Sequence, residues 1–303
     1  MTGSVSAPEP AGSRIALLGI GRMGHAMGLR LLDRGVSLTV WNRSPDRTAP
    51  LVEAGATAAP DVAAAATGAD VVLLALADGP AVDDVLFDRG LAEALPAGGL
   101  VADLSSIAPD AARRHAKALA GAGIDHLDAP VSGGVRGARG GTLTILAGGE
   151  QEAFRRASPA LGLLGQPHHL GPSGSGQLAK CVNQIIVGVT IAAVAEGMLL
   201  AAGGGADAAA VREALIGGFA DSRVLREHGR RMLERDFVAG GMVATQLKDL
   251  ETALDVARQE RLTLPLTERT TALYRDVAAQ LSPELDHSAV LLHLERAHAA
   301  RPR

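Results

Sequence analysis

The sequence predicts an α/β protein with an amino-terminal doubly wound sheet, then a long helix and an all-α carboxyl-terminal domain. Up to residue 172, short apolar runs alternate with helical stretches, which is typical of a parallel sheet covered by helices on both faces. Residues 173–205 form one long, mostly apolar stretch that opens with serine and glycine and ends in three glycines, as a helix does. After it only helical patterns occur. We therefore expect a disordered tail at 1–12 and domains at 13–172 and 173–303.

Composition argues against several function classes. A net charge of −4 and an aromatic content of 2% indicate neither a basic surface nor stacking side chains for nucleic acid. The single cysteine, Cys181, excludes an internal disulfide and fits a reducing cytoplasm, where we expect the protein to reside. The nine histidines show no spacing typical of metal ligands, so no metal site is predicted. Residues 1–12 lack the apolar run of a signal peptide.

A glycine-rich turn follows the first predicted strand, residues 14–19, and leads into a helical stretch closed by Gly35. Between a strand and a helix, the spacing G-x-G-x-x-G indicates the dinucleotide-binding turn of a Rossmann-like domain. Gly19 would make the tight turn, Gly21 would let a pyrophosphate approach the backbone, and Gly24 would let the helix pack on the strand. An ordinary glycine turn is the alternative. The predicted cofactor-binding residues here are Gly19, Ile20, Gly21, Arg22, Met23 and Gly24.

The second predicted strand, residues 37–41, is followed by Asn42, Arg43 and Ser44, which we also expect to contact the cofactor. A Rossmann unit that binds NAD usually has a carboxylate here, bonded to the ribose 2′-hydroxyl. A carboxylate would repel a 2′-phosphate, whereas a guanidinium binds one with two hydrogen bonds. We therefore predict NADP(H) as the preferred cofactor, with NAD(H) possible. A solvated loop arginine is the alternative, and Arg47 is a second candidate for the phosphate.

The next two predicted strands, residues 69–76 and 99–104, end in small or polar residues. Ligands of parallel sheets bind beyond the carboxyl ends of the strands, so we expect cofactor contacts from Ala77, Ser105 and Ser106. Capping of the following helix is an equally good interpretation of both serines.

A further predicted strand, residues 124–128, runs into Ser132, Gly133 and Gly134. Adjacent serine and glycine amides after a strand can form a small cradle for a carboxylate. The alternative is that these glycines only make the tight turns of a loop-rich sheet edge, completed by a strand at 142–147.

Three polar residues, Lys180, Asn183 and Gln184, lie on one face in the first turns of the long helix, which should be buried on nearly all sides. Burial and the positive end of the helix dipole would both lower the pKa of the lysine from about 10.4 toward the range of a working proton donor. A lysine that snorkels to the surface is the alternative. The helix approaches the length of a membrane span, but these residues and Glu196 favour a core helix of a soluble protein. We predict no membrane contact.

Four stretches stand in order along the chain: GIGRMG at 19–24, DAPVSGG at 128–134 with GTLTILAGG at 141–149, GSGQLAKCVNQ at 174–184, and LKDL at 247–250. Together they resemble the β-hydroxyacid dehydrogenases, a family that includes 3-hydroxyisobutyrate dehydrogenase and is related to 6-phosphogluconate dehydrogenase. The pair Asn183-Gln184 and the stretches at 217–225 and 285–290 are similar to the tartronate semialdehyde reductase branch of that family.

The resemblance implies NADPH-dependent reduction of a small carboxylated aldehyde or ketone, with tartronate semialdehyde to D-glycerate as the leading case. Lys180 would protonate the carbonyl oxygen while hydride arrives from the nicotinamide, and Asn183 would orient substrate and lysine. The cradle at 132–134 would hold the substrate carboxylate. The family also implies a homodimer or homotetramer. By position, the resemblance assigns Gln184 and Asp249 to the substrate pocket and Lys248 and Ser106 to the cofactor.

Two departures from the family pattern bear on specificity. Gly240-Gly241-Met242 stands where many relatives have Gly-Phe, whose aromatic ring closes over the substrate, so we expect a wider or less apolar substrate pocket. The neutral and basic residues at 42–44 differ from relatives with an acidic residue there, consistent with NADP(H).

Alternatives therefore stay open. They are a dehydrogenase of the 3-hydroxyisobutyrate or succinic semialdehyde type, a related imine reductase, and a catalytically silent NADP-binding module. Imine reductases usually lack a lysine at the position of Lys180, which argues against that alternative. Asp286, His287 and Ser288 are neighbours in sequence and so rarely meet as a catalytic triad, and we favour a helix cap by Asp286.

Overall fold

The computed structural model describes residues 13–299, so the predicted tail lies outside the described residues. The chain divides into two compact units, Met1–Lys180 and Cys181–Arg303. The division falls inside the long helix, eight residues after the predicted boundary between 172 and 173.

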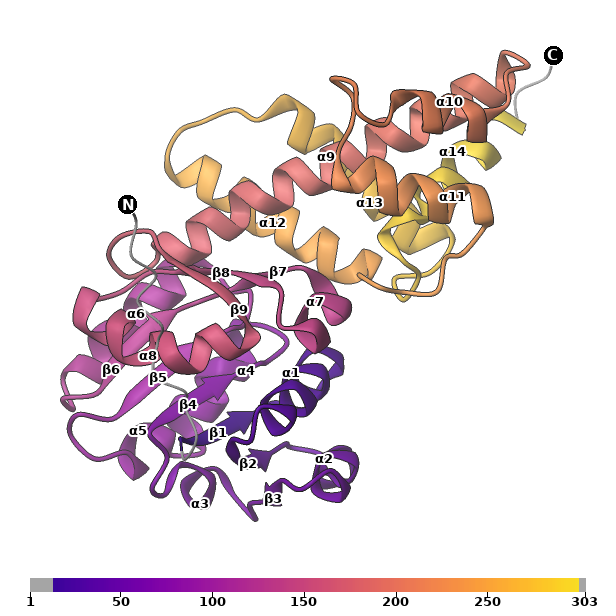
Figure 1. Ribbon diagram of the computed structural model, residues 1–303. Coiled ribbons are helices and arrows are strands. Elements are labelled where there is room, and N and C mark those ends of the chain that lie inside the picture. Colours follow the sequence, from indigo (N-terminus) through magenta and orange to yellow (C-terminus); the bar gives the residue numbers. More distant parts are fainter. Residues whose placement is uncertain (1–12, 300–303) are drawn as a thin grey trace, which may run out of the picture. The chain divides into compact units, whose positions relative to one another are not determined.

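The first unit is built on a six-stranded sheet in the order β3-β2-β1-β4-β5-β6, and all of its neighbouring strands are parallel (Figure 1). From β1 the chain adds β2 and β3 toward one edge of the sheet, and then β4, β5 and β6 on the other side of β1 toward the opposite edge. This is the order of a doubly wound dinucleotide-binding sheet, so the predicted fold class is confirmed. The strands are β1 (Arg14–Leu18), β2 (Ser37–Trp41), β3 (Thr57–Ala58), β4 (Val71–Leu74), β5 (Leu100–Asp103) and β6 (Asp125–Asp128).

Helices cover both faces of this sheet, which explains why its strands read as continuous apolar runs. Leu17 and Leu73 enter the layer packed by α1 (Arg22–Asp33) and α8 (Gln151–Leu164), whereas Leu18 enters the opposite layer. The remaining helices of this unit before β6 are η1 (Pro45–Thr48), α2 (Ala49–Glu53), α3 (Val62–Ala66), α4 (Gly79–Asp83), η2 (Asp84–Asp88), α5 (Leu91–Ala94) and α6 (Pro109–Ala120).

A second, three-stranded sheet follows, in the order β7 (Val131–Ser132), β8 (Leu143–Ala147), β9 (Gly165–His169), with α7 (Gly134–Gly140) between the first two strands. Sequence analysis missed β9, which is polar and carries Pro167. The strand lies at the edge of its sheet, where a proline can sit without removing a hydrogen bond from the ladder.

The predicted long helix is α9 (Ser175–Gly203), with 29 residues. Its most apolar window has a mean hydropathy of 2.2, enough by length and composition to cross a membrane, and 28% of that window is buried. The prediction of burial on nearly all sides is wrong for the single chain, because Val182, Ile186 and Leu200 are 51%, 61% and 77% exposed. Among the described residues of the second unit, one face of α9 enters the core, through Ile191 and its neighbours. A second copy of the chain over the exposed face remains a prediction.

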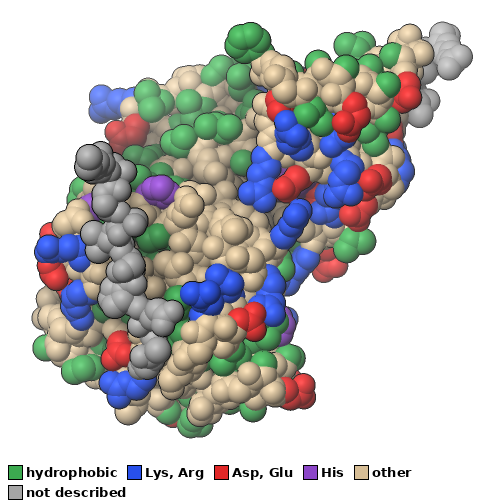
Figure 2. Space-filling model, viewed as in Figure 1, with side chains coloured by type: hydrophobic (Ala, Val, Ile, Leu, Met, Phe, Trp, Pro, Cys, Tyr) green, Lys and Arg blue, Asp and Glu red, His purple; other side chains and the backbone are tan. Residues whose placement is uncertain are grey.

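The second unit is helical, as the sequence predicts, and Leu250 and Tyr274 lie at the centre of its core. Figure 2 shows basic and acidic side chains intermixed on the visible face of this unit. One ion pair of the unit joins Arg235 to Glu295 at 2.7 Å. Its helices after α9 are α10 (Ala208–Leu215), η3 (Leu225–Gly229), α11 (Arg230–Glu234), α12 (Val243–Gln259), α13 (Pro265–Gln280), η4 (His287–Ala289) and α14 (Val290–Ala299).

Candidate active site

The glycine turn after β1 has the geometry that its spacing predicts. Gly19 has a φ of +100°, and a Cβ on Gly24 would lie 1.9 Å from Gly19 O, so only glycine lets α1 begin this close to the turn. A Cβ on Gly21 would meet nothing within 4 Å. The backbone at the start of the 12-residue helix α1 is therefore open to a ligand, and the positive end of the helix dipole there favours an anion. These residues fit the pyrophosphate of a dinucleotide.

Asn42 supports this turn directly. Its Oδ1 accepts a hydrogen bond from Ile20 N at 2.9 Å, and its Nδ2 donates to Ser44 O at 2.9 Å. The amide thus ties the end of β2 to the glycine turn, a role that the sequence analysis did not foresee. Arg43 is exposed directly beyond β2, where its guanidinium is available to a 2′-phosphate.

Ser105 joins the ends of two strands and does not cap a helix. Its Oγ accepts a hydrogen bond at 2.9 Å from Leu76 N, just after β4. The residue at the start of α6 is Ala108, and no side chain caps that helix, so the capping interpretation of Ser105 and Ser106 is wrong. Both serines, with Ala77, stand at the carboxyl edge of the sheet, and their contact with a cofactor remains a prediction.

The predicted carboxylate cradle lies where β7 runs into α7. Gly133 and Gly134 have φ values of +133° and +63°, which a side chain would strain. The tight-turn interpretation is therefore correct for the backbone. It is compatible with a cradle, because successive amides in such a turn can share one anion, here together with the half-buried Ser132.

Lys180 lies beside this turn. Its Nζ donates a hydrogen bond to Val131 O at 2.9 Å, one residue before Ser132, and the lysine is half-buried. A lysine that extends freely into solvent, the alternative interpretation, is not what the structure shows.

Gly176 explains how Lys180 reaches this position. A Cβ on Gly176 would lie 2.2 Å from Leu146 O and 2.3 Å from Asp128 O, so glycine lets the first turn of α9 press against β6 and β8. Lys180 follows four residues later and therefore faces the same side of the helix.

Asp128, which sequence analysis did not single out, caps the start of α9. Its Oδ1 accepts from Gly174 N at 2.7 Å and its Oδ2 from Gln177 N at 2.9 Å. Burial raises the pKa of Asp128, against the lowering effect of these backbone hydrogen bonds. The Gln177 side chain continues the network, since its Nε2 donates to Ser105 O at 2.8 Å and its Oε1 accepts from Ile107 N at 3.1 Å. The strand ends and the helix that carries the lysine are thus fixed together.

In the second unit, the predicted residues of α9 and α12 form a chain of polar contacts that is buried at Gln184 and Asp249. Asn183 Nδ2 donates to Gln184 Oε1 at 2.7 Å, and Gln184 Nε2 donates to Asp249 Oδ2 at 2.7 Å. Lys248 Nζ lies 3.3 Å from Asp249 Oδ1, and Asp249 is 4% exposed, so this pair is not an ordinary surface pair. Gln246, which sequence analysis missed, donates from its Nε2 to Gln184 O at 3.0 Å.

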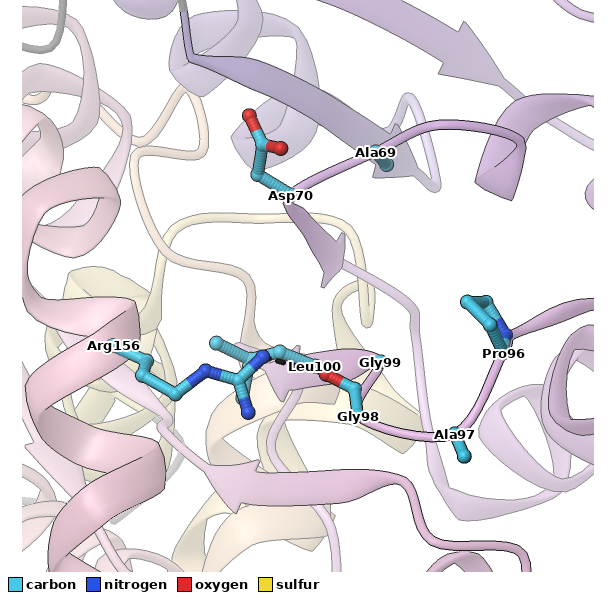
Figure 3. A pocket seen from close by; sticks show the side chains of 8 residues that line it. All are labelled: Ala69, Asp70, Pro96, Ala97, Gly98, Gly99, Leu100 and Arg156. Atoms are coloured by element: carbon cyan, nitrogen blue, oxygen red, sulfur yellow. Dashed lines mark hydrogen bonds between the residues drawn. The ribbon is translucent and has the colours of Figure 1, made fainter.

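A separate hollow of about 440 Å³ lies at the amino ends of β4 and β5, opposite to the carboxyl ends where the glycine turn and the serines lie. Figure 3 shows Arg156 of α8 extending toward Gly98 and Leu100, and its Nη2 donates to Gly98 O at 2.6 Å. The glycine turn and the serines lie at the carboxyl ends of the strands, so this hollow is not the predicted cofactor site.

Comparison with known proteins agrees with this arrangement. Residues 14–188 match the family described as the NAD binding domain of 6-phosphogluconate dehydrogenase. Residues 174–294 match the NAD-binding family of NADP-dependent 3-hydroxyisobutyrate dehydrogenase. The chain belongs to the 3-hydroxyisobutyrate dehydrogenase-like β-hydroxyacid dehydrogenases.

One relative of this β-hydroxyacid dehydrogenase is 2-hydroxy-3-oxopropionate reductase from Escherichia coli strain K12. It is 40% identical over 284 residues, which cover 93% of this chain and 97% of the relative. A solved structure of Mycobacterium tuberculosis 3-hydroxyisobutyrate dehydrogenase with L-serine has a TM-score of 0.85 at 30% identity, over 93% of this chain and 99% of that one. Psf3 in complex with NADP+ and 2-OPP has a TM-score of 0.85 at 28% identity, over 92% and 99%. The protein is therefore an NAD(P)-dependent oxidoreductase.

In this β-hydroxyacid dehydrogenase, Asp286 is a helix-capping carboxylate, as predicted. It accepts from Ser288 N at 3.0 Å and from Gly240 N at 2.8 Å, and Ser288 Oγ donates to it directly at 2.6 Å. In a triad, by contrast, a histidine stands between serine and carboxylate. Burial alone would raise the pKa of Asp286, but the neighbouring His228, whose Nδ1 lies 3.7 Å from Asp286 Oδ1, the charge of His287 and the bonds from Ser288 outweigh it and lower the pKa.

Proposed function

We propose that the protein is an NADPH-dependent reductase of a small carboxylated aldehyde, with tartronate semialdehyde (2-hydroxy-3-oxopropionate) to D-glycerate as the first candidate reaction. The observation that carries the proposal is the position of Lys180. Its amine is held at 2.9 Å from Val131 O, directly before the turn predicted to bind the substrate carboxylate.

In this proposal, the Nζ of Lys180 donates a proton to the carbonyl oxygen as that oxygen becomes a hydroxyl, and takes the proton back in the oxidative direction. A reduced nicotinamide, when bound, supplies the hydride that adds to the carbonyl carbon. The turn at 132–134 binds the carboxylate end of the substrate and so presents its carbonyl to the lysine. The lysine regains its proton from water after the hydroxy acid leaves.

The preference for NADPH rests on the end of β2. Asn42 is neutral and is occupied with the glycine turn, and Arg43 beside it is exposed. A 2′-phosphate would meet a cation and no carboxylate there.

The substrate is proposed from the relative named 2-hydroxy-3-oxopropionate reductase, which matches nearly the whole chain. The segment at 240–242 lacks the aromatic residue of the family pattern, so a larger substrate such as succinic semialdehyde is the second candidate.

The proposal is tested by following NADPH oxidation with tartronate semialdehyde, succinic semialdehyde and a cyclic imine, and NADP+ reduction with L-serine. We expect the highest kcat/KM for tartronate semialdehyde. A clear preference for the imine would replace the proposal with imine reduction.

The role of the lysine is tested with Lys180→Ala, which should lower kcat by about 100-fold or more because a general acid is lost, while NADPH affinity is unchanged. Lys117→Ala is the matched control, since Lys117 is an exposed lysine of α6. Full carbonyl reduction by Lys180→Ala would show that another group protonates the substrate.

A further inference from the structure

Three buried polar side chains meet inside the first unit, in a layer that is otherwise apolar. Asp103 comes from the end of β5, His126 from β6 and His115 from α6, and they are 0%, 5% and 1% exposed. One ligand atom of each, a carboxylate oxygen or a ring nitrogen, lies within 4.8 Å of the other two. We call these residues the Asp103–His115–His126 cluster.

The sheet register brings this cluster together. In the β5–β6 ladder, Val101 pairs with His126 and Asp103 pairs with Asp128, so Asp103 and His126 lie on adjacent strands. His115 lies on the buried stripe of α6 with Ala112, which packs in the same apolar layer as Val101. The cluster therefore occupies positions that the pattern of the fold would fill with apolar side chains.

Three of the four ring nitrogens of the cluster lack a hydrogen-bond partner within the described chain. Both ring nitrogens of His126 and the Nδ1 of His115 are buried and have none. Buried polar groups of folded proteins are nearly always paired, with protein or with a bound species, so three such nitrogens on two neighbouring rings require an explanation.

Asp83 fixes the tautomer of His115. The Nε2 of His115 lies 2.6 Å from Asp83 Oδ1, where it carries the hydrogen and donates it to the carboxylate. The Nδ1 of His115 is then left with its lone pair. A carboxylate that orients a histidine in this way is the usual outer partner of a metal-bound imidazole.

The other ring is also in the form that binds metal. His126 is 5% exposed and both of its ring nitrogens are buried without a partner in the described chain, so the nitrogen that carries no hydrogen can offer its lone pair to an ion. Metal ligands must be deprotonated, and a neutral imidazole meets that condition without losing a proton.

We propose that Asp103, His115 and His126 bind a divalent transition-metal ion, for which Zn²⁺ is the probe. Two imidazoles and a carboxylate suit Zn²⁺, which binds such ligands at about 2.0–2.2 Å. Ligand atoms within 4.8 Å of one another approach a common ion after side-chain movements of about 1 Å. Because Asp103 Oδ1 also accepts from Ser105 N at 2.9 Å, the ion would stiffen the loop that carries the predicted cofactor serines. The site is independent of the proposed reaction.

The experiment uses the full chain without an affinity tag, stripped with a chelator and then titrated with Zn²⁺ in a calorimeter, with metal content measured after dialysis. We expect one Zn²⁺ per chain and a rise in Tm. His126→Phe should lose the bound metal, because phenylalanine fills the site without a ligand atom. His168→Gln, which removes an exposed histidine outside the cluster, should bind as the wild type does.

A second variant keeps the test decisive if His126→Phe folds poorly. Asp83 is 47% exposed, so Asp83→Asn should fold normally, yet it should weaken Zn²⁺ binding by about 10- to 100-fold through loss of the outer partner. Wild-type protein that retains no stoichiometric Zn²⁺ would overturn the proposal and indicate that ordered water satisfies the imidazoles. Unchanged binding by both His126→Phe and Asp83→Asn would place the metal elsewhere and would also overturn it.

Discussion

The Asp128 carboxylate accepts a hydrogen bond from the backbone N–H of Gln177 at 2.9 Å, three residues before Lys180. The other carboxylate oxygen accepts from Gly174 N at 2.7 Å. A strand end and a helix start that lie far apart in sequence are joined by this one side chain. The position of the lysine therefore depends on a carboxylate that has no proposed contact with the substrate.

Replacing Asp128 with Asn should destabilise the protein by about 1–3 kcal/mol, because the amide offers one acceptor and turns its NH2 group toward the second N–H. The free energy of unfolding from urea titrations at neutral pH measures this cost. Asp61→Asn is the control, since Asp61 caps the short helix α3 through Ala64 N in an exposed position. Asn caps helices about as well as Asp, so Asp61→Asn should be nearly neutral. Equal effects of the two substitutions would refute the special role of Asp128.

Two glycine substitutions separate cofactor binding from folding. Gly21→Ala adds a methyl group where nothing lies within 4 Å, so unfolding should change by less than about 1 kcal/mol while NADPH affinity falls. Gly24→Ala places a Cβ 1.9 Å from Gly19 O and should cost about 3 kcal/mol or more, with loss of cofactor binding as a consequence. Thermal unfolding and NADPH titration of both variants check this. If Gly21→Ala bound NADPH normally, the pyrophosphate would not lie at this turn.

Cofactor choice is expected to depend on Arg43 more than on Asn42. Arg43→Gln should lower kcat/KM for NADPH by about 10- to 100-fold, the worth of a charged hydrogen bond to phosphate, and leave NADH unaffected. Asn42→Asp keeps the acceptor for Ile20 N and adds a repelling charge, so it should shift preference toward NADH. Arg34→Gln, an exposed arginine at the far end of α1, is the control. Unchanged cofactor ratios in both variants would contradict the predicted NADPH preference.

Features encoded by local spacing could be predicted from the sequence. The turn at 19–24, the long helix and the lysine on it depend on residues within a few turns of one another, and the structure contains each of them. β9 could not be predicted, because an edge strand can tolerate polar residues and Pro167.

Features encoded by strand register could not be predicted. Asp103, His115 and His126 belong to three different elements, and only the pairing of β5 with β6 and the packing of α6 bring them together. The Gln177–Asp128 bond likewise joins residues 49 positions apart. Asn42 was placed correctly at the end of β2, but its hydrogen bond to the glycine turn depends on how β1 and β2 align.

The acid stability of the metal-free protein should depend on His126. Because burial lowers its pKa from 6.5 to about 3, the unfolded chain binds a proton between these values that the folded chain does not. Lowering the pH below 6.5 therefore reduces the free energy of unfolding by up to about 1.4 kcal/mol per pH unit, whereas above pH 6.5 the full contribution of the neutral His126 is present.

His126→Phe has no such group. Its free energy of unfolding minus that of the wild type should therefore increase by about 2 kcal/mol as the pH falls from about 7 to about 5. Urea unfolding with a chelator present measures both proteins, and His168→Gln should follow the wild type. Parallel pH profiles for His126→Phe and the wild type would show that His126 titrates normally in the folded protein, and so is not a neutral, buried imidazole.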